Sequence, residues 1–284
     1  MVKEMNANFI VNDYVLIWTL LFGTSISETI YKLKQKIWKT YKNEYNEIFK
    51  DKDEILKDYK NFIPNDDTIY NIVLENIDYE RIKKQTGKYR IEIMKLWDKK
   101  QKETENLVKN ILRIKMPKYT VFIVSEELNV INHSQKDKLI VGKQLGKNEP
   151  LRILIDINFS IAKNHLKKYK GEYENIKKTI LELAVQNEYA TRLLGRSCYQ
   201  TGDPKLSSIK KWLYPYWLMY LGVSKEEFFS YMMRDKIVFE VEEYIYEPEL
   251  KKMDIEEFIE FCIRNQRYII KKPKVGIKKE VEIL

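Results

Sequence analysis

Apolar residues recur at helical spacing through the first third of the chain. Ile26, Ile30, Leu33 and Ile37 follow one another at intervals of three or four positions, which is typical of a helix that buries one side. The same spacing continues further along the chain and predicts one long helix over residues 26–50.

A shorter apolar run lies ahead of it, from Tyr14 to Phe22. It has less than half of the ~20 residues that a membrane-spanning helix needs, and no small-residue cleavage site follows it, as a secretory signal requires. The run therefore predicts a buried core helix, and we expect neither a targeting segment nor a membrane partner.

Helices are also predicted over residues 68–81 and 88–115. The second of these separates its charged positions from its apolar positions, with the basic residues inside an arc of roughly 80°. The basic side consists of Lys88, Lys95, Lys99, Lys102, Lys109 and Arg113, and the other side of Tyr89, Ile93, Trp97, Leu107 and Ile111.

The pattern changes after Pro117. Residues 119–124 and 138–142 are rich in β-branched and aromatic residues and predict two strands. Apolar helical patterns then return over residues 151–166, 174–194 and 255–270, with a further helix beginning at Pro204. The order predicts a predominantly helical α+β fold with a small central sheet. We expect a helical N-terminal region over residues 1–117 and an α+β core with a helical C-terminal part over residues 118–284.

Composition and charge narrow the function classes. Two cysteines cannot form a disulfide framework, which favours a reducing, cytoplasmic setting. The two histidines, 32 positions apart, exclude an HExxH zinc helix, and no phosphate-binding glycine loop occurs. We therefore expect no metal and no cofactor. The net charge of +9 lies in one segment, because residues 81–118 contain thirteen Lys and Arg against four Asp and Glu.

The stretch from Leu181 to Leu194 combines apolar residues on nearly every side with several ionisable groups. A helix that is apolar all round is predicted to be buried, and a buried carboxylate needs a partner, a ligand or a raised pKa. Glu182, Glu188, Tyr189 and Arg192 are therefore candidate site residues. A polar network that only holds helices in register explains them equally well.

The order of the predicted elements resembles the core of zincin-type metallopeptidases of the gluzincin branch. This order is a pair of strands, then a buried helix, then a second helix that bears a glutamate. In this resemblance, Asp156 matches the first zinc-binding histidine, Ile157 the catalytic glutamate, Ser160 the second histidine and Glu182 the third ligand. An alternative match over residues 187–191 keeps Glu188 but has neither histidine. The resemblance implies a metallopeptidase-like protein without zinc, a pseudoenzyme.

Three functions remain open. The first is binding of a peptide or protein segment in a groove beside the sheet, with Glu182, Glu188, Tyr189 and Arg192 as its polar floor. The second is metal-independent acid–base catalysis by the same groups, with Asp156 or the nucleophile Cys198 nearby; a cysteine nucleophile needs a base, and His165 is the candidate.

The third function is nucleic-acid binding through the lysine stripe of residues 88–113, with Lys95, Lys99 and Lys102 at its centre. Clustered lysines are the electrostatic footprint of a nucleic-acid binder. A plain solvated helix face is the more common explanation of such a stripe, and no helix-turn-helix, RNP1-like or zinc-finger motif accompanies it.

Overall fold

The computed structural model describes residues 7–25, 27–114, 118–125, 128–129, 133–135, 137–142, 150–194, 202–224 and 248–266. They belong to two compact units. Unit 1 is drawn from residues 1–102 and 116–165, and unit 2 from residues 103–115 and 166–284. This division does not coincide with the boundary predicted at residue 117, because each unit takes chain from both sides of that point.

A mixed sheet forms the middle of unit 1. Its strand order is β1-β3-β6-β5, and the bounds are Ala7–Ile10 for β1, Tyr119–Ile123 for β3, Lys138–Val141 for β6 and His133–Gln135 for β5. Strands β1 and β6 run parallel to β3, whereas β5 is antiparallel to β6. Strands β2 (Thr24–Ser25) and β4 (Leu128–Asn129) pair separately. The predicted strands are therefore confirmed as β3 and β6.

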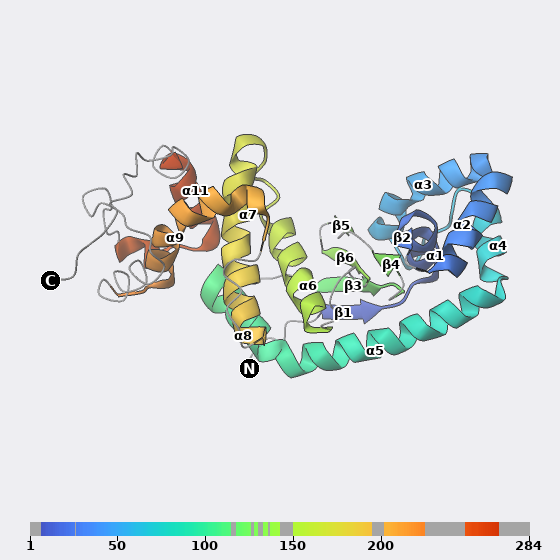
Figure 1. Cartoon of the computed structure of the whole chain (residues 1–284), viewed down its shortest axis with the longest axis horizontal. Helices are drawn as coiled ribbons and strands as arrows, with labels where there is room; N and C mark the ends of the chain where they lie inside the picture. The colour runs from blue at the N-terminus through green and yellow to red at the C-terminus, as the bar shows by residue number, and fades with distance from the viewer. Residues whose placement is uncertain are drawn as a thin grey trace. The chain divides into compact units, whose positions relative to one another are not determined.

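Strand β1 is a correction to the predicted helical N-terminal region, since residues 7–10 join the sheet. The register sets Phe9 beside Val121 of β3, and Phe9 packs edge-on against Trp97 with ring centroids 5.4 Å apart. The sheet itself is small, and helix supplies most of the described structure, as predicted (Figure 1).

The apolar run near the N-terminus forms helix α1 (Asp13–Phe22), in which every residue from Val15 to Leu21 is buried. Asn12 caps it by accepting a hydrogen bond from the Val15 N–H at 3.0 Å. The prediction of a core helix is confirmed, and α1 belongs to an apolar cluster of buried residues in unit 1.

The helix predicted over residues 26–50 is two helices, α2 (Glu28–Thr40) and α3 (Lys42–Lys57). The break lies at Tyr41, whose backbone angles of φ −128° and ψ 53° are not helical. Contacts with the end of α1 accompany it: the Tyr45 hydroxyl donates to the Leu21 carbonyl at 2.6 Å, and Phe22 packs against Tyr45 and Phe49. Tertiary contact therefore overrides a continuous helical pattern.

Helix α4 (Thr68–Leu74) leads into α5, which runs without interruption from Ile77 to Asn106. The pattern predicted a boundary between residues 81 and 88, and this was wrong because Gly87 is accommodated inside the helix. Asp13 fixes the N-terminal part of α5 to α1, since it accepts hydrogen bonds from the Tyr79 hydroxyl at 2.5 Å and from Lys83 Nζ at 2.9 Å.

Replacing Gly87 with alanine should raise the free energy of unfolding by about 1 kcal/mol, because glycine costs that much relative to alanine inside a helix. An added Cβ would meet nothing within 4 Å. Urea denaturation measures the change. Gly171→Ala is the matched control: its site is equally open but has φ +66°, so alanine there should destabilise. A Gly87→Ala protein no more stable than its parent would contradict the prediction.

Helix α6 (Pro150–His165) completes unit 1 and confirms the helix predicted over residues 151–166. Its residues Leu154, Ile157 and Ala162 are fully buried. Helix α6 contacts strand β6 and therefore covers part of the sheet.

The described elements of unit 2 are all helices. The unit contains the π-helix η1 (Leu107–Leu112), the short 3₁₀ helix η2 (Gly171–Tyr173), and a continuous helical segment made of α7 (Glu174–Leu181), the π-helix η3 (Glu182–Tyr189) and α8 (Ala190–Leu194). The remaining elements are η4 (Pro204–Leu206), α9 (Ser207–Leu221), η6 (Pro248–Lys252) and α11 (Ile255–Arg264). Among the described residues, no helix is both long and apolar enough to cross a membrane.

Candidate functional site

The candidate site residues of unit 2 lie on the π-helix η3. A π-helix bonds each N–H to the carbonyl five residues back and often marks a functional site. Both Glu182 and Tyr189 are buried, whereas Glu188 is only partly buried and Arg192, in α8, is exposed. The prediction that residues 181–194 form a buried helix with ionisable groups inside it is therefore confirmed for Glu182.

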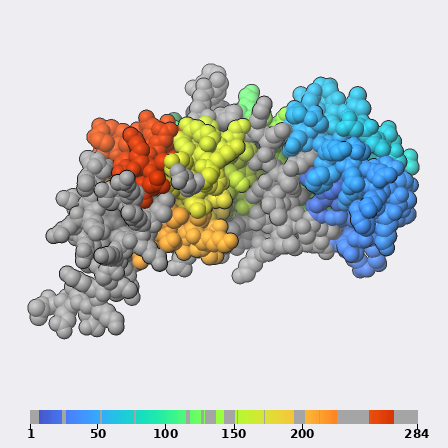
Figure 2. Space-filling view, turned by 90° about the horizontal axis from the view of Figure 1, so that it is seen from above, coloured from blue at the N-terminus to red at the C-terminus, as the bar shows by residue number. Residues whose placement is uncertain are grey.

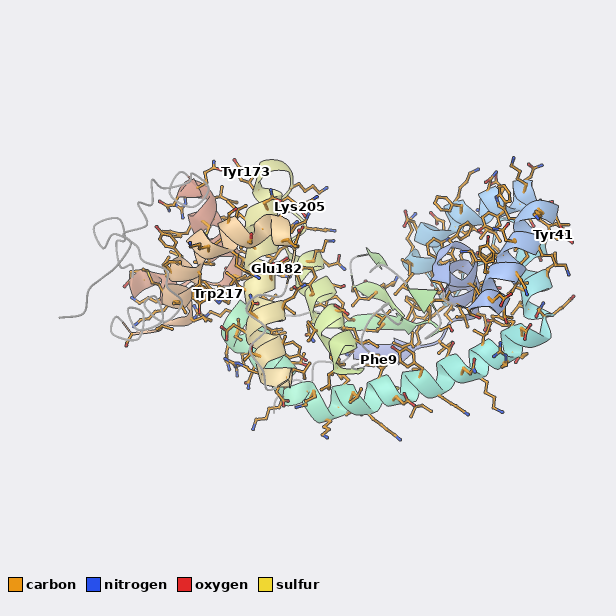
Figure 3. The ribbon with its side chains drawn as sticks, viewed as in Figure 1. Phe9, Tyr41, Tyr173, Glu182, Lys205 and Trp217 are labelled. Atoms are coloured by element: carbon orange, nitrogen blue, oxygen red, sulfur yellow. The ribbon has the colours of Figure 1, made fainter. Side chains whose placement is uncertain are left out.

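The Glu182 carboxylate, labelled in Figure 3, is held by an ion pair inside unit 2. Its Oε2 lies 3.2 Å from Lys210 Nζ of α9, and the two side chains are only 6% and 9% exposed. Its Oε1 accepts a hydrogen bond from the Asp203 N–H at 2.8 Å. The close approach of Gly202 completes the enclosure, because a Cβ on that residue would lie 2.2 Å from Oε2. These contacts are those of a structural ion pair.

Tyr189 connects η3 to the C-terminal end of α5. Its side chain is fully buried, and its hydroxyl shares a hydrogen bond of 2.8 Å with the hydroxyl of Thr104, which is 1% exposed. Thr104 lies at the end of α5 just before η1, and η1 and η3 are in contact. The Tyr189 hydroxyl therefore has a partner within the protein core.

Glu188 is the candidate with a perturbed carboxyl group. Burial raises the pKa of the Glu188 carboxyl, while the nearby Arg192 guanidinium and the Trp217 indole act in the opposite direction. A raised pKa is compatible with acid–base chemistry, although buried structural carboxylates have the same property. The catalytic prediction for these residues stays a prediction.

The remaining candidates of the zincin resemblance do not lie on η3. Asp156, Ile157 and Ser160 belong to α6 of unit 1, where Ile157 is fully buried and Ser160 is 4% exposed. Cys198 lies outside the described residues, so its predicted role as a nucleophile stays a prediction. Within the part of the chain that the structure describes, no three His, Cys, Asp or Glu side chains lie together as a metal site requires.

Strand β1 lies at one edge of the sheet, where a bound peptide could pair with it as an additional strand. A contact within unit 1 disfavours this pairing. Arg90 of α5 donates from Nη1 to the Phe9 carbonyl at 3.1 Å, so a backbone acceptor of β1 is already taken. Side chains that engage an edge strand disfavour pairing with another chain. The predicted peptide groove beside the sheet gains no support from this edge.

The lysine stripe divides into two parts with different surroundings. Lys88, Lys95, Lys99 and Lys102, named the lysine face from here on, belong to unit 1 and are all exposed on α5. On the other side of the helix, Tyr89, Ile93 and Trp97 are at most 8% exposed. The predicted separation of charged and apolar sides is therefore confirmed, and nitrogen-tipped side chains project from α5 on the side away from the sheet (Figure 3).

Arg113 is a correction to the predicted stripe. Its guanidinium is used inside unit 2, where it donates to the carbonyls of Lys251, Met253 and Tyr220 at 2.6, 2.7 and 2.8 Å. It also lies 4.3 Å from the centroid of the Tyr220 ring. The helical arc could not predict this, because Arg113 ends η1 in a left-handed conformation with φ 54°.

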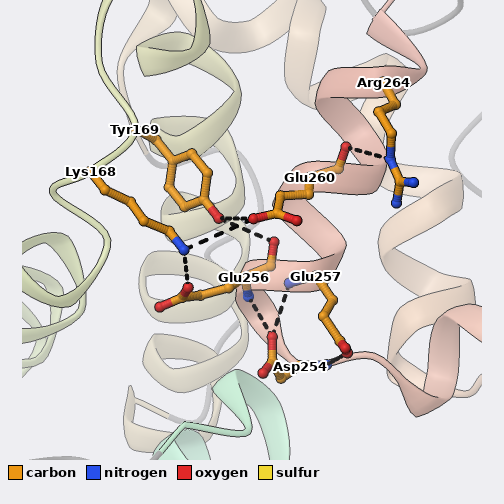
Figure 4. Close-up of polar contacts among 7 residues, drawn as sticks. All are labelled: Lys168, Tyr169, Asp254, Glu256, Glu257, Glu260 and Arg264. Atoms are coloured by element: carbon orange, nitrogen blue, oxygen red, sulfur yellow. Dashed lines mark hydrogen bonds and ion pairs between the residues drawn. The ribbon is translucent and has the colours of Figure 1, made fainter.

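The contacts that join residues 168–169 to α11 in unit 2 were missed in the sequence (Figure 4). Lys168 pairs with Glu256 of α11, and the Tyr169 hydroxyl donates to Glu260 at 3.1 Å. Asp254 and Glu257 form the capping box of the same helix. The spacing of Asp254 and Glu257 predicts the box, but only the fold brings Lys168 and Tyr169 to it. The contacts of Lys168 and Tyr169 attach the chain around residue 168 to α11.

Comparison of the chain with protein-family models, with curated proteins and with solved structures found no match. The resemblance to zincin-type metallopeptidases, and the site it implies, therefore stay a prediction.

Proposed function

We propose that the protein binds nucleic acid through the lysine face of α5. The first and last of the four lysines are fourteen positions apart, which is about 21 Å of helix axis at the α-helical rise. Duplex DNA carries roughly twelve phosphate charges over that length. A helix with ammonium groups along one side over this length can lie along such a backbone.

The observation that carries the proposal is that these ammonium groups are uncompensated. Within the described residues, none of the four lysines forms an ion pair with a carboxylate. Other exposed lysines do so, among them Lys32 with Glu28, Lys50 with Glu47 and Lys252 with Glu249. Glu92 and Asp98 lie between these lysines in sequence, and within the described residues no ion pair joins either of them to the lysine face.

The apolar side of α5 supports the proposal in a second way. Tyr89, Ile93 and Trp97 are buried in unit 1, and Asp13 holds the N-terminal turns through Tyr79 and Lys83. The lysines therefore project from a helix whose position in unit 1 is fixed. Binding has to order only the long side chains, each at a cost of about 0.5–1.5 kcal/mol.

A triple variant should bind duplex DNA at least tenfold more weakly than the parent protein. In it, glutamine replaces Lys95, Lys99 and Lys102. The triple change should also lower the slope of log K against log salt by about 2–3, since each phosphate contact contributes about 0.9. Fluorescence anisotropy of a labelled duplex, titrated at several salt concentrations, measures both quantities.

The matched control changes the same net charge elsewhere, with Lys57, Lys251 and Lys252 replaced by glutamine. All three are exposed and lie off the lysine face. The control should keep its affinity within about twofold and lose less than one unit of slope. Equal losses in the two triple variants, or no binding by the parent protein at low salt, would refute the proposal.

A further inference from the structure

Helix α2 has two large aromatic side chains in solvent. Tyr31 is 57% and Trp38 46% exposed, and they lie seven residues apart on α2, hence on one side of it and about 10 Å apart along its axis. A single exposed aromatic residue needs no explanation. Two on the same face of one helix form a surface that the fold of unit 1 does not use.

Lysines surround these two rings. Residues 29–43 contain five lysines and no acidic residue. Four of the lysines, Lys32, Lys36, Lys39 and Lys42, are exposed, and Lys42 Nζ lies 5.9 Å from the centroid of the Trp38 ring. Together with Tyr31 and Trp38, these four residues are named the aromatic–lysine face.

The charge of this face indicates what covers it. Protein–protein interfaces are enriched in aromatic residues but depleted in lysine, so the four exposed lysines of this face, of which Lys32 pairs with Glu28, do not fit a protein partner. Single-stranded nucleic acid needs both features, because its bases stack on exposed aromatic rings while a positive surface holds its backbone. Figure 2 shows the blue side chains of α2 and α3 at the surface of unit 1.

We infer that the aromatic–lysine face binds single-stranded nucleic acid by stacking bases on Tyr31 and Trp38. The inference rests on the proposed function in that it names the form of nucleic acid that unit 1 binds. Both faces belong to one compact unit. Helix α1 contacts α2 and is fixed to α5 through Asp13, so the two faces are held by the same core.

The test separates stacking from charge by comparing two probes. One is a labelled oligothymidylate of about 15 nucleotides; the other is an abasic strand of equal length, which has the same phosphates without bases. The parent protein should bind the oligothymidylate at least tenfold more tightly. Trp38→Ala should reduce this preference about tenfold, and the double variant with Tyr31→Ala should remove it, while the salt slope stays unchanged.

Two variants serve as controls. Trp38→Phe keeps a ring and should keep most of the preference for bases, which shows that a loss in Trp38→Ala is not a loss of folding. Ile63→Ala removes an apolar side chain that is 84% exposed and lies off α2; it should leave both affinities unchanged. Circular dichroism checks that each variant has the parent's helix content.

The results distinguish this inference from the proposed function. An oligothymidylate preference that survives in the double variant overturns the inference, even if the lysine-face variant has lost duplex binding. A preference that depends on Trp38 while the lysine-face variant binds normally supports the inference and refutes the proposed function. Self-association that depends on Trp38, measured by sedimentation without nucleic acid, overturns the inference in favour of a protein interface.

Discussion

Replacing Glu182 with glutamine is expected to lower the free energy of unfolding by about 3–5 kcal/mol, because Lys210 would be left buried without its anion. The two charged atoms are 3.2 Å apart, and neither side chain is more than a tenth exposed. An ammonium group in that position has lost most of its hydration, and glutamine cannot supply a charge to replace it. Urea denaturation followed by circular dichroism measures the change.

The double variant Glu182→Leu with Lys210→Met tests the reason for this loss. It removes both charges, and replacing a buried pair by apolar residues of similar size is often neutral; its stability should therefore lie within about 2 kcal/mol of the parent. The matched control is Glu249→Gln, which breaks an ion pair whose side chains are 65–66% exposed and should cost less than about 1 kcal/mol. A Glu182→Gln protein as stable as its parent would contradict the structural role of the pair and favour the groove hypothesis.

Replacing Arg113 with alanine should cost about 2–4 kcal/mol, the second largest effect that we expect. The change removes three hydrogen bonds from a charged donor to backbone carbonyls and the contact with the Tyr220 ring. Arg113→Lys keeps the charge but not the planar fork that reaches three carbonyls, so it should recover only a small part. Thermal and urea denaturation measure the order of the variants.

Arg113→Gly isolates the backbone contribution at the same position. Arg113 is the one described residue other than glycine with a positive φ, a conformation that costs an L-residue roughly 1 kcal/mol or more. Glycine loses the same side-chain contacts as alanine but adopts this conformation without strain. The glycine variant should therefore be more stable than the alanine variant by about 1 kcal/mol. The reverse order would mean that the guanidinium contacts do not hold a strained backbone.

The strongest sequence pattern was also the most reliable. In α5, the lysines and the apolar residues follow the α-helical period over four turns, and burial separates them as predicted. The prediction was wrong at the end of this pattern, for Arg113, because the number of residues per helical turn changes there. Residues 107–112 form a π-helix, so the angle assigned to Arg113 from 3.6 residues per turn no longer applies.

The same change of period explains what was missed at the candidate site. An α-helical period places Glu182 and Tyr189 on one side of a helix, as the groove hypothesis required. Residues 182–189 are instead π-helical, and these two side chains find separate partners, Lys210 and Thr104. That Glu182 is buried could be predicted from its apolar neighbours. Its partner could not, because Lys210 is 28 residues away and carries no local signal.

The sequence did not predict the short strand β1 or the break at Tyr41, for a different reason. Strand β1 has four residues, only one of which is buried, so it gives no alternating pattern of useful length. Its strand character comes from pairing with β3, more than a hundred residues later. Likewise, no glycine or proline in the sequence indicates the break at Tyr41. Contacts of Tyr45 and Phe49 with α1 accompany this break.

The chain passes from unit 1 to unit 2, back to unit 1 and then to unit 2 again. This path sets the order in which the two units can fold during synthesis. Unit 1 has its full set of residues once position 165 has left the ribosome, whereas unit 2 needs the chain beyond it. Domains generally fold as units in the order in which they emerge. In the interval, Leu107, Val108, Ile111 and Leu112 of η1 are already made but lack their neighbours from η3. We therefore expect a chaperone to bind this apolar stretch of the nascent chain.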